Sequence, residues 1–254
     1  MKKPVVIFIV LLFAFHFELR AQTNSNKNNP WSIGVGAYVG ESFRKITIND
    51  FSAINSDIAA DRELHEDFIT GFTGQLNVQY NFTPSLGLES GLQYAVRGYK
   101  GVYENLVFGD IIDPRLGFTG AGGAGITKVD FLYRYHFLSL PVRARFNVGK
   151  SKVRWTSGLG FSFDYLNSYR VTTMKEKIDG TIDSDTQKYS SGDVKMRSFN
   201  GSVLISTGVQ YQLTAYDHPR IELYYRSALS PTADVPISDR LWDIGLCFSY
   251  VRSF

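Results

Sequence analysis

Residues 137–163 read FLSLPVRARFNVGKSKVRWTSGLGFSF, and the alternation within them decides the fold. Apolar residues take every second position from Leu138 to Val148, with serine, proline, arginine and asparagine between them. A second alternating arm runs from Val153 to Tyr165, after the polar turn 149–152. Alternation with period 2 on both sides of a short glycine-containing turn predicts two antiparallel β-strands.

Four aromatic residues precede this hairpin in the opposite phase, namely Phe131, Tyr133, Tyr135 and Phe137. One additional residue between His136 and Leu138 would bring them onto the same face as the apolar residues that follow. We therefore predict a β-bulge at this place. Pro141 cannot donate a ladder hydrogen bond, which also indicates an irregular stretch.

The polar face of the hairpin indicates which side is inside. It combines small residues with long charged ones: Gly158, Gly160, Ser162, Arg143, Arg145 and Arg154. A soluble, lipocalin-like barrel would enclose the apolar face, whereas a membrane barrel turns that face to lipid. A narrow barrel of about eight strands fills its lumen with side chains of varied size, and a water-facing exterior has no need of glycines. We predict that the polar face lines the lumen.

The rest of the chain repeats the same pattern. Alternation predicts strands at 31–39, 68–82, 86–100, 128–148, 153–171, 198–213, 220–229 and 241–254. Their connections alternate between long and short, and the loops 41–67, 101–127 and 172–197 are the longest. Outer-membrane barrels have an even strand number, short periplasmic turns and longer external loops. The sequence thus predicts an all-β, eight-stranded, antiparallel up-and-down transmembrane β-barrel with both termini in the periplasm.

The N-terminus indicates export. Lys2 and Lys3, the apolar run 4–17 and Leu19-Arg20-Ala21 predict a cleavable signal peptide over 1–21. A membrane anchor is the alternative, but the run is short of the about 20 residues that span a bilayer. We expect a flexible segment over 22–30 and the barrel domain over 31–254, in a bacterial outer membrane.

Composition excludes some classes of function. Cleavage would remove three basic residues and one acidic residue, so the net charge would fall from +3 to +1. A net charge this close to zero gives no indication of a nucleic-acid-binding surface. Cys247 is the one cysteine, so no internal disulfide can form; we expect it to be a small residue on a strand face. Aromatic residues are 15% of the chain while mean hydropathy is −0.12, which a barrel with a polar lumen accommodates.

Aromatic residues gather where this topology places the membrane boundaries. The predicted girdle at the short turns comprises Trp31, Tyr80, Phe82, Phe146, Trp155, Tyr211 and Tyr250. Tyr133, Tyr165 and Trp242 are predicted at the other boundary. The alternative is that aromatic residues are simply common in strands. Phe248, Tyr250 and Phe254 on the last strand are similar to the terminal signal read by barrel assembly machinery, although Arg252 stands where an apolar residue is usual.

Short motifs resemble a known family. Leu86–Tyr94, LGLESGLQY, and Phe137–Val142, FLSLPV, follow a leader ending in Ala-Gln and a glycine-rich first strand. Together they resemble the PorT-like outer-membrane β-barrel domain family. The resemblance implies an eight-stranded barrel in a Gram-negative outer membrane. Its named member is associated with protein secretion and maturation, but no residue here carries that role over.

Charged residues of both signs are predicted to face the lumen: Glu89, Arg97, Arg143, Arg145, Arg154, Asp164, Glu222, Arg226 and Asp243. Buried charges must be paired, so we expect a network that fills and stiffens the barrel. A narrow or gated ion path is the alternative, and large, steady single-channel conductance would support it.

Catalytic, metal and cofactor sites are not expected. The mature histidines are His65, His136 and His218; His136 lies near Ser139, and some lipid-modifying outer-membrane enzymes use such a pair. Neighbours in a strand point to alternating faces, however, and no acidic partner is identifiable. No Cys/His cluster has metal spacing. Asp179-Gly180 with 183–185 could suggest calcium, but a solvated turn fits better because the EF-hand pattern is missing.

The long loops leave partner binding as the expected function. We expect a non-enzymatic barrel whose external loops or outer wall engage lipid and another envelope or secretion-system component. The alternatives are a small gated pore, a lipid-modifying enzyme and a soluble ligand-binding barrel in the periplasm.

Overall fold

The computed structural model describes residues 30–48, 52–104, 126–149, 151–190, 196–233, 235 and 237–254. The predicted signal peptide 1–21, nearly all of 22–30 and most of the loop 101–127 lie outside the described residues. The elements are β1 (Trp31–Ile48), α2 (Ala53–Leu64), β2 (Glu66–Asn81), β3 (Leu86–Glu104), β4 (Ile126–Val148), β5 (Val153–Lys177), β6 (Ile182–Ser190), β7 (Phe199–Tyr211), β8 (Asp217–Ala228) and β9 (Ile237–Ser253).

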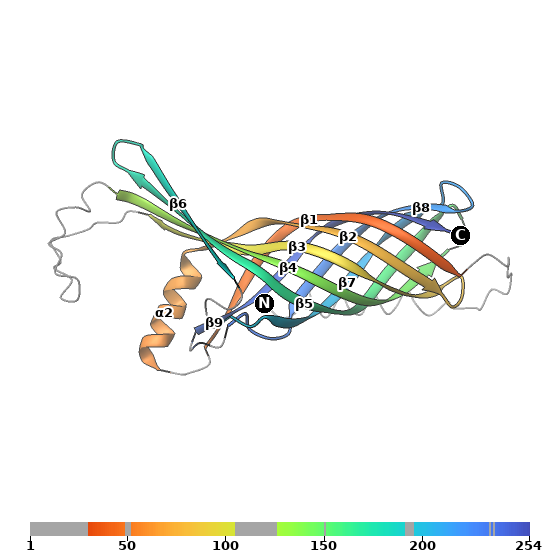
Figure 1. Ribbon diagram of the computed structural model, residues 1–254, viewed down its shortest axis with the longest axis horizontal. Helices are drawn as coiled ribbons and strands as arrows, with labels where there is room; N and C mark the ends of the chain where they lie inside the picture. The colour runs from red at the N-terminus through yellow and green to blue at the C-terminus, as the bar shows by residue number, and fades with distance from the viewer. Residues whose placement is uncertain are drawn as a thin grey trace.

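Eight of the nine strands close into a ring (Figure 1). Each neighbouring pair is antiparallel from β1 to β5, then β5 pairs with β7, and the order continues through β8 to β9. β9 pairs with β1 over 17 registered positions from Ser32 to Ile48, so the barrel has no open edge. The predicted eight-stranded, antiparallel, up-and-down barrel is confirmed.

The two ends of the barrel differ. Short connections at 82–85, 149–152 and 212–216 lie at one end, and the Phe254 amide donates to the Trp31 carbonyl there at 3.3 Å. We name this the turn end and the opposite one the loop end. Beyond the ring at the loop end, β3, β4 and β5 continue outward, and β6 adds a strand that pairs with β5 (Figure 1).

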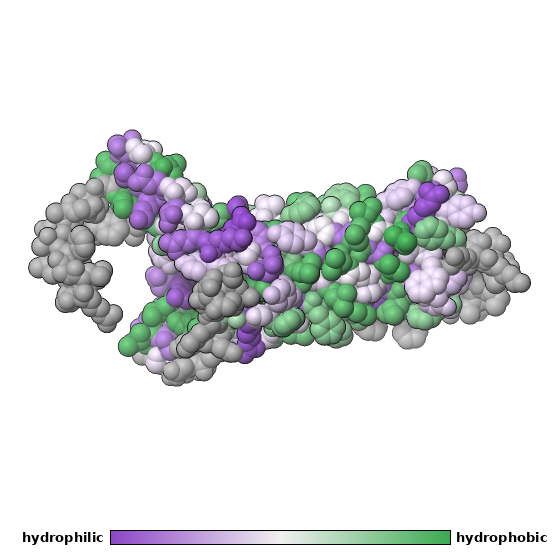
Figure 2. Space-filling model, in the orientation of Figure 1, coloured by the Kyte–Doolittle hydropathy of each residue, from purple (hydrophilic) through white to green (hydrophobic). Residues whose placement is uncertain are grey.

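Period-2 alternation gives the wall two unlike faces. On β1, Trp31, Ile33 and Val35 are about half exposed to the outside, whereas Ser32 and Tyr38 are buried inside. The same alternation on the other strands forms an apolar belt of exposed side chains, and Figure 2 shows them in green among paler residues along the barrel. The direction of the faces agrees with the prediction, polar inward and apolar outward.

The structure extends several predicted strands and adds two elements. β1 continues to Ile48 and β5 to Lys177, where loops were expected. Helix α2 lies within the predicted loop 41–67; Ser52 caps it by accepting a hydrogen bond from the Asn55 amide at 3.1 Å. Among the described residues, no helix is long and apolar enough to cross a membrane. The predicted polar loop 172–197 instead contains a hairpin that turns at Gly180, where φ is +80°.

The predicted bulge is present, but its expected consequence was wrong. The register of β4 with β5 shifts between His136 and Phe137, and the additional residue, Asn167, lies on β5. β4 itself keeps its phase, so Tyr135 and Phe137 lie on the same inner side as Ser139 and are buried. These rings face the interior because they share the inward parity of Ser139 on the same strand.

Candidate functional site

The predicted lumen residues lie inside the barrel with one exception. Eight of them are at most 2% exposed: Glu89, Arg97, Arg143, Arg145, Asp164, Glu222, Arg226 and Asp243. The exception is Arg154, which is half-buried near the turn end, where its Nη2 lies 3.5 Å from the Gln212 side-chain oxygen. The interior divides into three layers between the turn end and the loop end.

The first layer, nearest the turn end, is built around two glutamates. Glu89 accepts hydrogen bonds from Arg143, from Arg145 Nε at 2.8 Å and from Arg220 Nη1 at 3.1 Å. Arg145 also reaches Glu222, donating from Nη2 at 2.9 Å. Gly158 makes room for this contact, because a Cβ there would lie 3.1 Å from Arg145 Nη1. Bidentate arginine–carboxylate pairs of this kind are strong and directional.

Arg220 is a lumen residue that sequence reasoning missed. It is 4% exposed and also donates to Gln210 at 2.8 Å and to Gln79 at 2.7 Å. Its position shares the parity of Glu222 and Arg226 on β8. That parity was a usable signal, but Arg220 stands beside the predicted turn, where a charge is normally solvated.

The second layer is built around Asp164. The carboxylate accepts from Ser162 at 2.6 Å and from Ser202 at 2.5 Å, and Arg97 lies 3.1 Å away. Arg226 completes the layer by donating to Gln93 at 2.6 Å. Further contacts join Asp243 to Arg97 at 3.6 Å and Gln75 to the buried thiol of Cys247 at 3.3 Å. In these two layers, five arginines face four carboxylates, so nearly all the buried charge is compensated.

The third layer is apolar. Its buried members are Ala95, Tyr99, Tyr135, Phe137, Leu166 and Leu241. The Arg97 guanidinium stacks over the Phe137 ring with 4.2 Å to the centroid, so this layer rests directly on the one below. Three successive layers of packed side chains therefore fill the lumen.

A partly open cavity of about 590 Å³ lies above the third layer, at the loop end. We name it the vestibule; its aromatic lining residues are Tyr99, Tyr103, Phe131, Tyr133, Tyr135 and Tyr169. The rings stack on one another, Tyr99 on Tyr133 at 4.6 Å and Tyr135 on Tyr169 at 5.1 Å. Asn55 and Arg62 of α2 contribute to the rim.

A charged cluster lies on one side of the vestibule. Arg44 donates to Asp239 at 2.9 Å, contacts Glu66, and lies over the Tyr99 ring at 3.9 Å. Tyr99 donates its hydroxyl to the other Asp239 oxygen at 3.0 Å. The vestibule thus combines ring faces with fixed charges. Sequence reasoning missed it because Arg44 and Glu66 were assigned to a loop.

The predicted girdle residues mostly lie on the outer wall. Trp31, Phe82, Trp155, Tyr211 and Tyr250 are more than 40% exposed at the turn end. Tyr80 and Phe146 are half-buried beside them, and Trp31 packs edge-on against Tyr80 at 4.8 Å. At the other boundary, Trp242 stacks on Phe43 at 4.3 Å and Tyr165 packs on Phe199 at 5.1 Å. The placement of Tyr133 in that girdle was wrong, because the unbroken phase of β4 turns it into the vestibule.

The residues of the last strand considered as an assembly signal also face outward. Phe248, Tyr250 and Phe254 are each about half exposed.

The histidines do not assemble a catalytic site. His136 is on the outward side of β4 and contacts the Tyr94 hydroxyl at 2.7 Å, whereas Ser139 is buried in the lumen. His65 follows α2 and stacks on Tyr103, and His218 is the second residue of β8, near the turn end. No group of three or more His, Cys, Asp and Glu in the described part of the chain could hold a metal ion. Asp179 caps a turn by accepting from the Thr181 amide at 2.9 Å.

Comparisons with solved structures return membrane barrels. Neisserial surface protein A is 13% identical, with a TM-score of 0.39 and coverage of 88% of this chain and 96% of that one. The outer membrane protein OprG from Pseudomonas aeruginosa is 12% identical, with a TM-score of 0.38 and coverage of 89% and 97%. The outer membrane protease OmpT from Escherichia coli is 9% identical, with a TM-score of 0.34 and coverage of 92% and 100%. At these identities the similarity says nothing about ligands or activity.

No curated protein matches the chain. A family model described as "Outer membrane protein beta-barrel domain" matches residues 21–234, which is most of the chain. The match covers every barrel strand up to β8; β9, which contributes Leu241, Asp243 and Asp239, follows the matched range. The chain therefore belongs to the outer membrane protein beta-barrel domain family.

Proposed function

We propose that this outer-membrane β-barrel is a non-conducting, non-enzymatic anchor that presents the vestibule to a binding partner. The observation that carries the proposal is the contrast between the two halves of the interior. The lumen is filled by three layers of paired charges and rings, while the loop end holds a cavity of about 590 Å³. A filled lumen favours a structural barrel over a pore.

The chemistry of the vestibule points to a class of partner. Pockets of a few hundred Å³ with aromatic walls and a few fixed polar groups commonly bind ligands. Stacked tyrosines offer flat apolar faces at low entropic cost, as they do in protein interfaces. We infer that a segment of an envelope or secretion-system protein inserts apolar or aromatic side chains there. Arg44 and Asp239 would orient it through hydrogen bonds.

Orientation and export belong to the same proposal. Short turns and long loops favour a periplasmic turn end and an external loop end. Export would use a signal peptide over 1–21, and assembly machinery would read Phe248, Tyr250 and Phe254. The motifs at 86–94 and 137–142 support a place near the PorT-like members of the family, without their secretion role.

Two measurements test this function. In planar bilayers, the purified chain should give no large, steady single-channel current, and such currents would contradict the proposal. Affinity purification from outer membranes in mild detergent should recover a stoichiometric partner that the Tyr103→Ala/Tyr169→Ala variant loses. The matched control is Tyr211→Ala, an exposed tyrosine at the turn end. A partner retained by the vestibule variant would contradict the assigned site.

A further inference from the structure

Three basic side chains lie in a line across the outer surface at the loop end. Arg134 on β4 is directly opposite Arg170 on β5, and Arg170 is directly opposite Lys188 on β6. Directly opposite residues of antiparallel strands project from the same face of the sheet. All three side chains are exposed. Arg134 has the parity of the lipid-facing Leu138 and Leu140, so this basic row continues the outer wall rather than the vestibule.

The basic row has no neutralising partner among the described residues. No carboxylate there lies within ion-pair distance of Arg134, Arg170 or Lys188. Farther out on the same face, by contrast, Lys100 pairs with Asp130 at 2.9 Å and Lys128 with Glu104 at 2.7 Å. Like charges directly opposite each other destabilise a sheet. An anion from outside this part of the chain would therefore stabilise the row.

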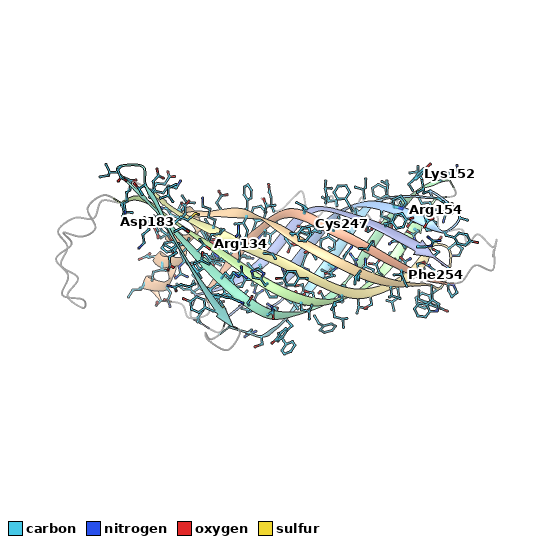
Figure 3. All side chains as sticks on the ribbon, turned by 45° about the horizontal axis from the view of Figure 1, so that its top comes forward. Arg134, Lys152, Arg154, Asp183, Cys247 and Phe254 are labelled. Carbon is cyan, nitrogen blue, oxygen red and sulfur yellow. The ribbon has the colours of Figure 1, made fainter. Side chains whose placement is uncertain are left out.

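The row lies at the edge of the apolar belt. Leu138 and its partner Tyr94 are the last strongly exposed apolar residues of β4 and β3 in this direction. Arg134 is four residues farther along β4, or about 13 Å along the strand. With a strand tilt of about 45°, this rise is about 9 Å along the membrane normal. Figure 3 places Arg134 where β4 leaves the barrel, and Figure 2 shows hydrophilic side chains next to the belt there.

That height places the Arg134 backbone just beyond the headgroup zone, which its long side chain can reach. The polar region adds about 5–7 Å to the hydrocarbon on each side of a bilayer, and long basic side chains bend toward such a boundary. Polar groups also lie between the apolar belt and the basic row. His136 is between Leu138 and Arg134 on β4, and its Nδ1 lies 2.7 Å from the Tyr94 hydroxyl. His136 Nε2 has no hydrogen-bond partner in the described part of the chain.

We propose that Arg134, Arg170 and Lys188 bind the phosphate of an anionic lipid headgroup in the leaflet at the loop end. Two observations select lipid as the occupant. The row is complementary in charge to a phosphate, and it lies on the same outer face of β4 as the lipid-facing Leu138. This site is separate from the vestibule, so it stands or fails independently of the partner proposed for that cavity.

The test measures retained lipid on the purified full chain. The probe is phosphatidylglycerol in mixed micelles, counted by native mass spectrometry against phosphatidylcholine, and then lipid A by the same method. The variant is Arg134→Gln/Arg170→Gln/Lys188→Gln. The control, Lys100→Gln/Lys128→Gln/Lys152→Gln, removes the same charge from two paired sites and from the turn end. Each basic side chain near a headgroup contributes about fivefold to anionic-lipid affinity, so the row variant should bind about 100-fold more weakly.

Several outcomes would overturn the proposal. Equal phosphatidylglycerol binding by the row variant and the wild type would do so, as would an equal loss in the control. Complete competition by millimolar inorganic phosphate, with no preference for lipid, would mark the row as a site for a soluble anion. The single variant Lys188→Gln separates lost binding from misfolding, because β6 lies outside the ring. It should weaken phosphatidylglycerol binding about fivefold. Unchanged binding would count against the proposed site.

Discussion

Arg145 and Glu222 join strands that are not neighbours in the sheet. Arg145 projects from β4 and donates across the lumen to the Glu222 carboxylate on β8, at 2.9 Å from Nη2. The same guanidinium donates to Glu89 on β3. The contact reaches over the intervening strands β5 and β7, where Gly158 leaves room for it and Ser206 contacts both partners, and it fills the lumen at this level.

Removing one partner of this pair should destabilise the barrel. Glu222→Gln keeps the shape but leaves Arg145 short of a charge partner in a buried site, which costs about 3–5 kcal/mol. Urea unfolding of the reconstituted chain, followed by heat-modifiable gel mobility and tryptophan fluorescence, measures the change. The control is Glu104→Gln, which breaks only the exposed pair with Lys128, and should leave the midpoint unchanged. Equal midpoints for the wild type and Glu222→Gln would show that the network adds little stability.

The apolar belt predicts a depth-dependent response to charge on the outer wall. Leu159 and Val153 face outward on β5 and are 55% and 53% exposed. Leu159 lies midway between Val153 and Tyr165, so Leu159→Arg should cost about 2–4 kcal/mol, whereas Val153→Arg at the boundary should cost about 0–1 kcal/mol. Unfolding in lipid vesicles gives both values. Equal costs would mean that the belt is not centred on Leu159.

Much of this architecture follows from alternation alone. Each barrel strand carries small or charged residues at one set of alternate positions and apolar residues at the other. The inward direction of the polar face was therefore predictable, and Gly158 and Arg145 of the central hairpin indicated it first. The alternation also predicted that the lumen carboxylates point inward. They lie on the same face as arginines that can pair with them, as buried charges require. Arg220 obeys the same parity and escaped only because of its neighbouring turn.

The rule that apolar residues face outward failed where the strands leave the belt. Tyr133 and Tyr135 were assigned outward, yet they line the vestibule, because beyond the boundary the outside of a strand meets headgroups and water. The basic Arg134 between them is the residue that faces out. Two elements were missed: α2 is signalled by the Ser52 cap, and β6 by the Asp179-Gly180 turn. Both signals compete with a polar composition typical of loops.

The three lumen layers act in series, which makes a specific prediction about conductance. Tyr135→Ala/Phe137→Ala removes two of the three rings of the third layer but leaves both charged layers, so currents in planar bilayers should stay at the wild-type baseline. Adding Arg143→Ala, Arg145→Ala and Arg220→Ala in the first layer together with Arg97→Ala and Arg226→Ala in the second should produce steady currents, because every layer has then lost side chains that close the lumen. Heat-modifiable mobility confirms that each variant is assembled. Steady currents from the Tyr135→Ala/Phe137→Ala variant would instead identify the rings as the only barrier.

The end of β9 predicts an effect on assembly rather than on stability. Phe254 is 51% exposed on the outer wall, and its backbone N–H donates a hydrogen bond to the Trp31 carbonyl at 3.3 Å. Phe254→Ala removes little packing, so the folded chain should unfold at the wild-type midpoint. If the terminal aromatic is read during insertion, the assembled fraction in outer membranes should still fall severalfold. Phe82→Ala, which changes a 59% exposed ring at the same end, is the matched control.

The two outcomes of that comparison separate recognition from anchoring. Loss of assembly in both variants would mean that the ring serves only as a boundary anchor, since Phe82 has the same setting without being terminal. A lower assembled fraction in Phe254→Ala alone would show that assembly depends on an aromatic residue at the end of the last strand. Arg252 interrupts the apolar pattern and lies 3.8 Å from Asp217. Arg252→Leu should therefore raise the assembled fraction if the apolar pattern is what the machinery reads, and lower it if the Asp217 contact is needed to hold β9 against β8.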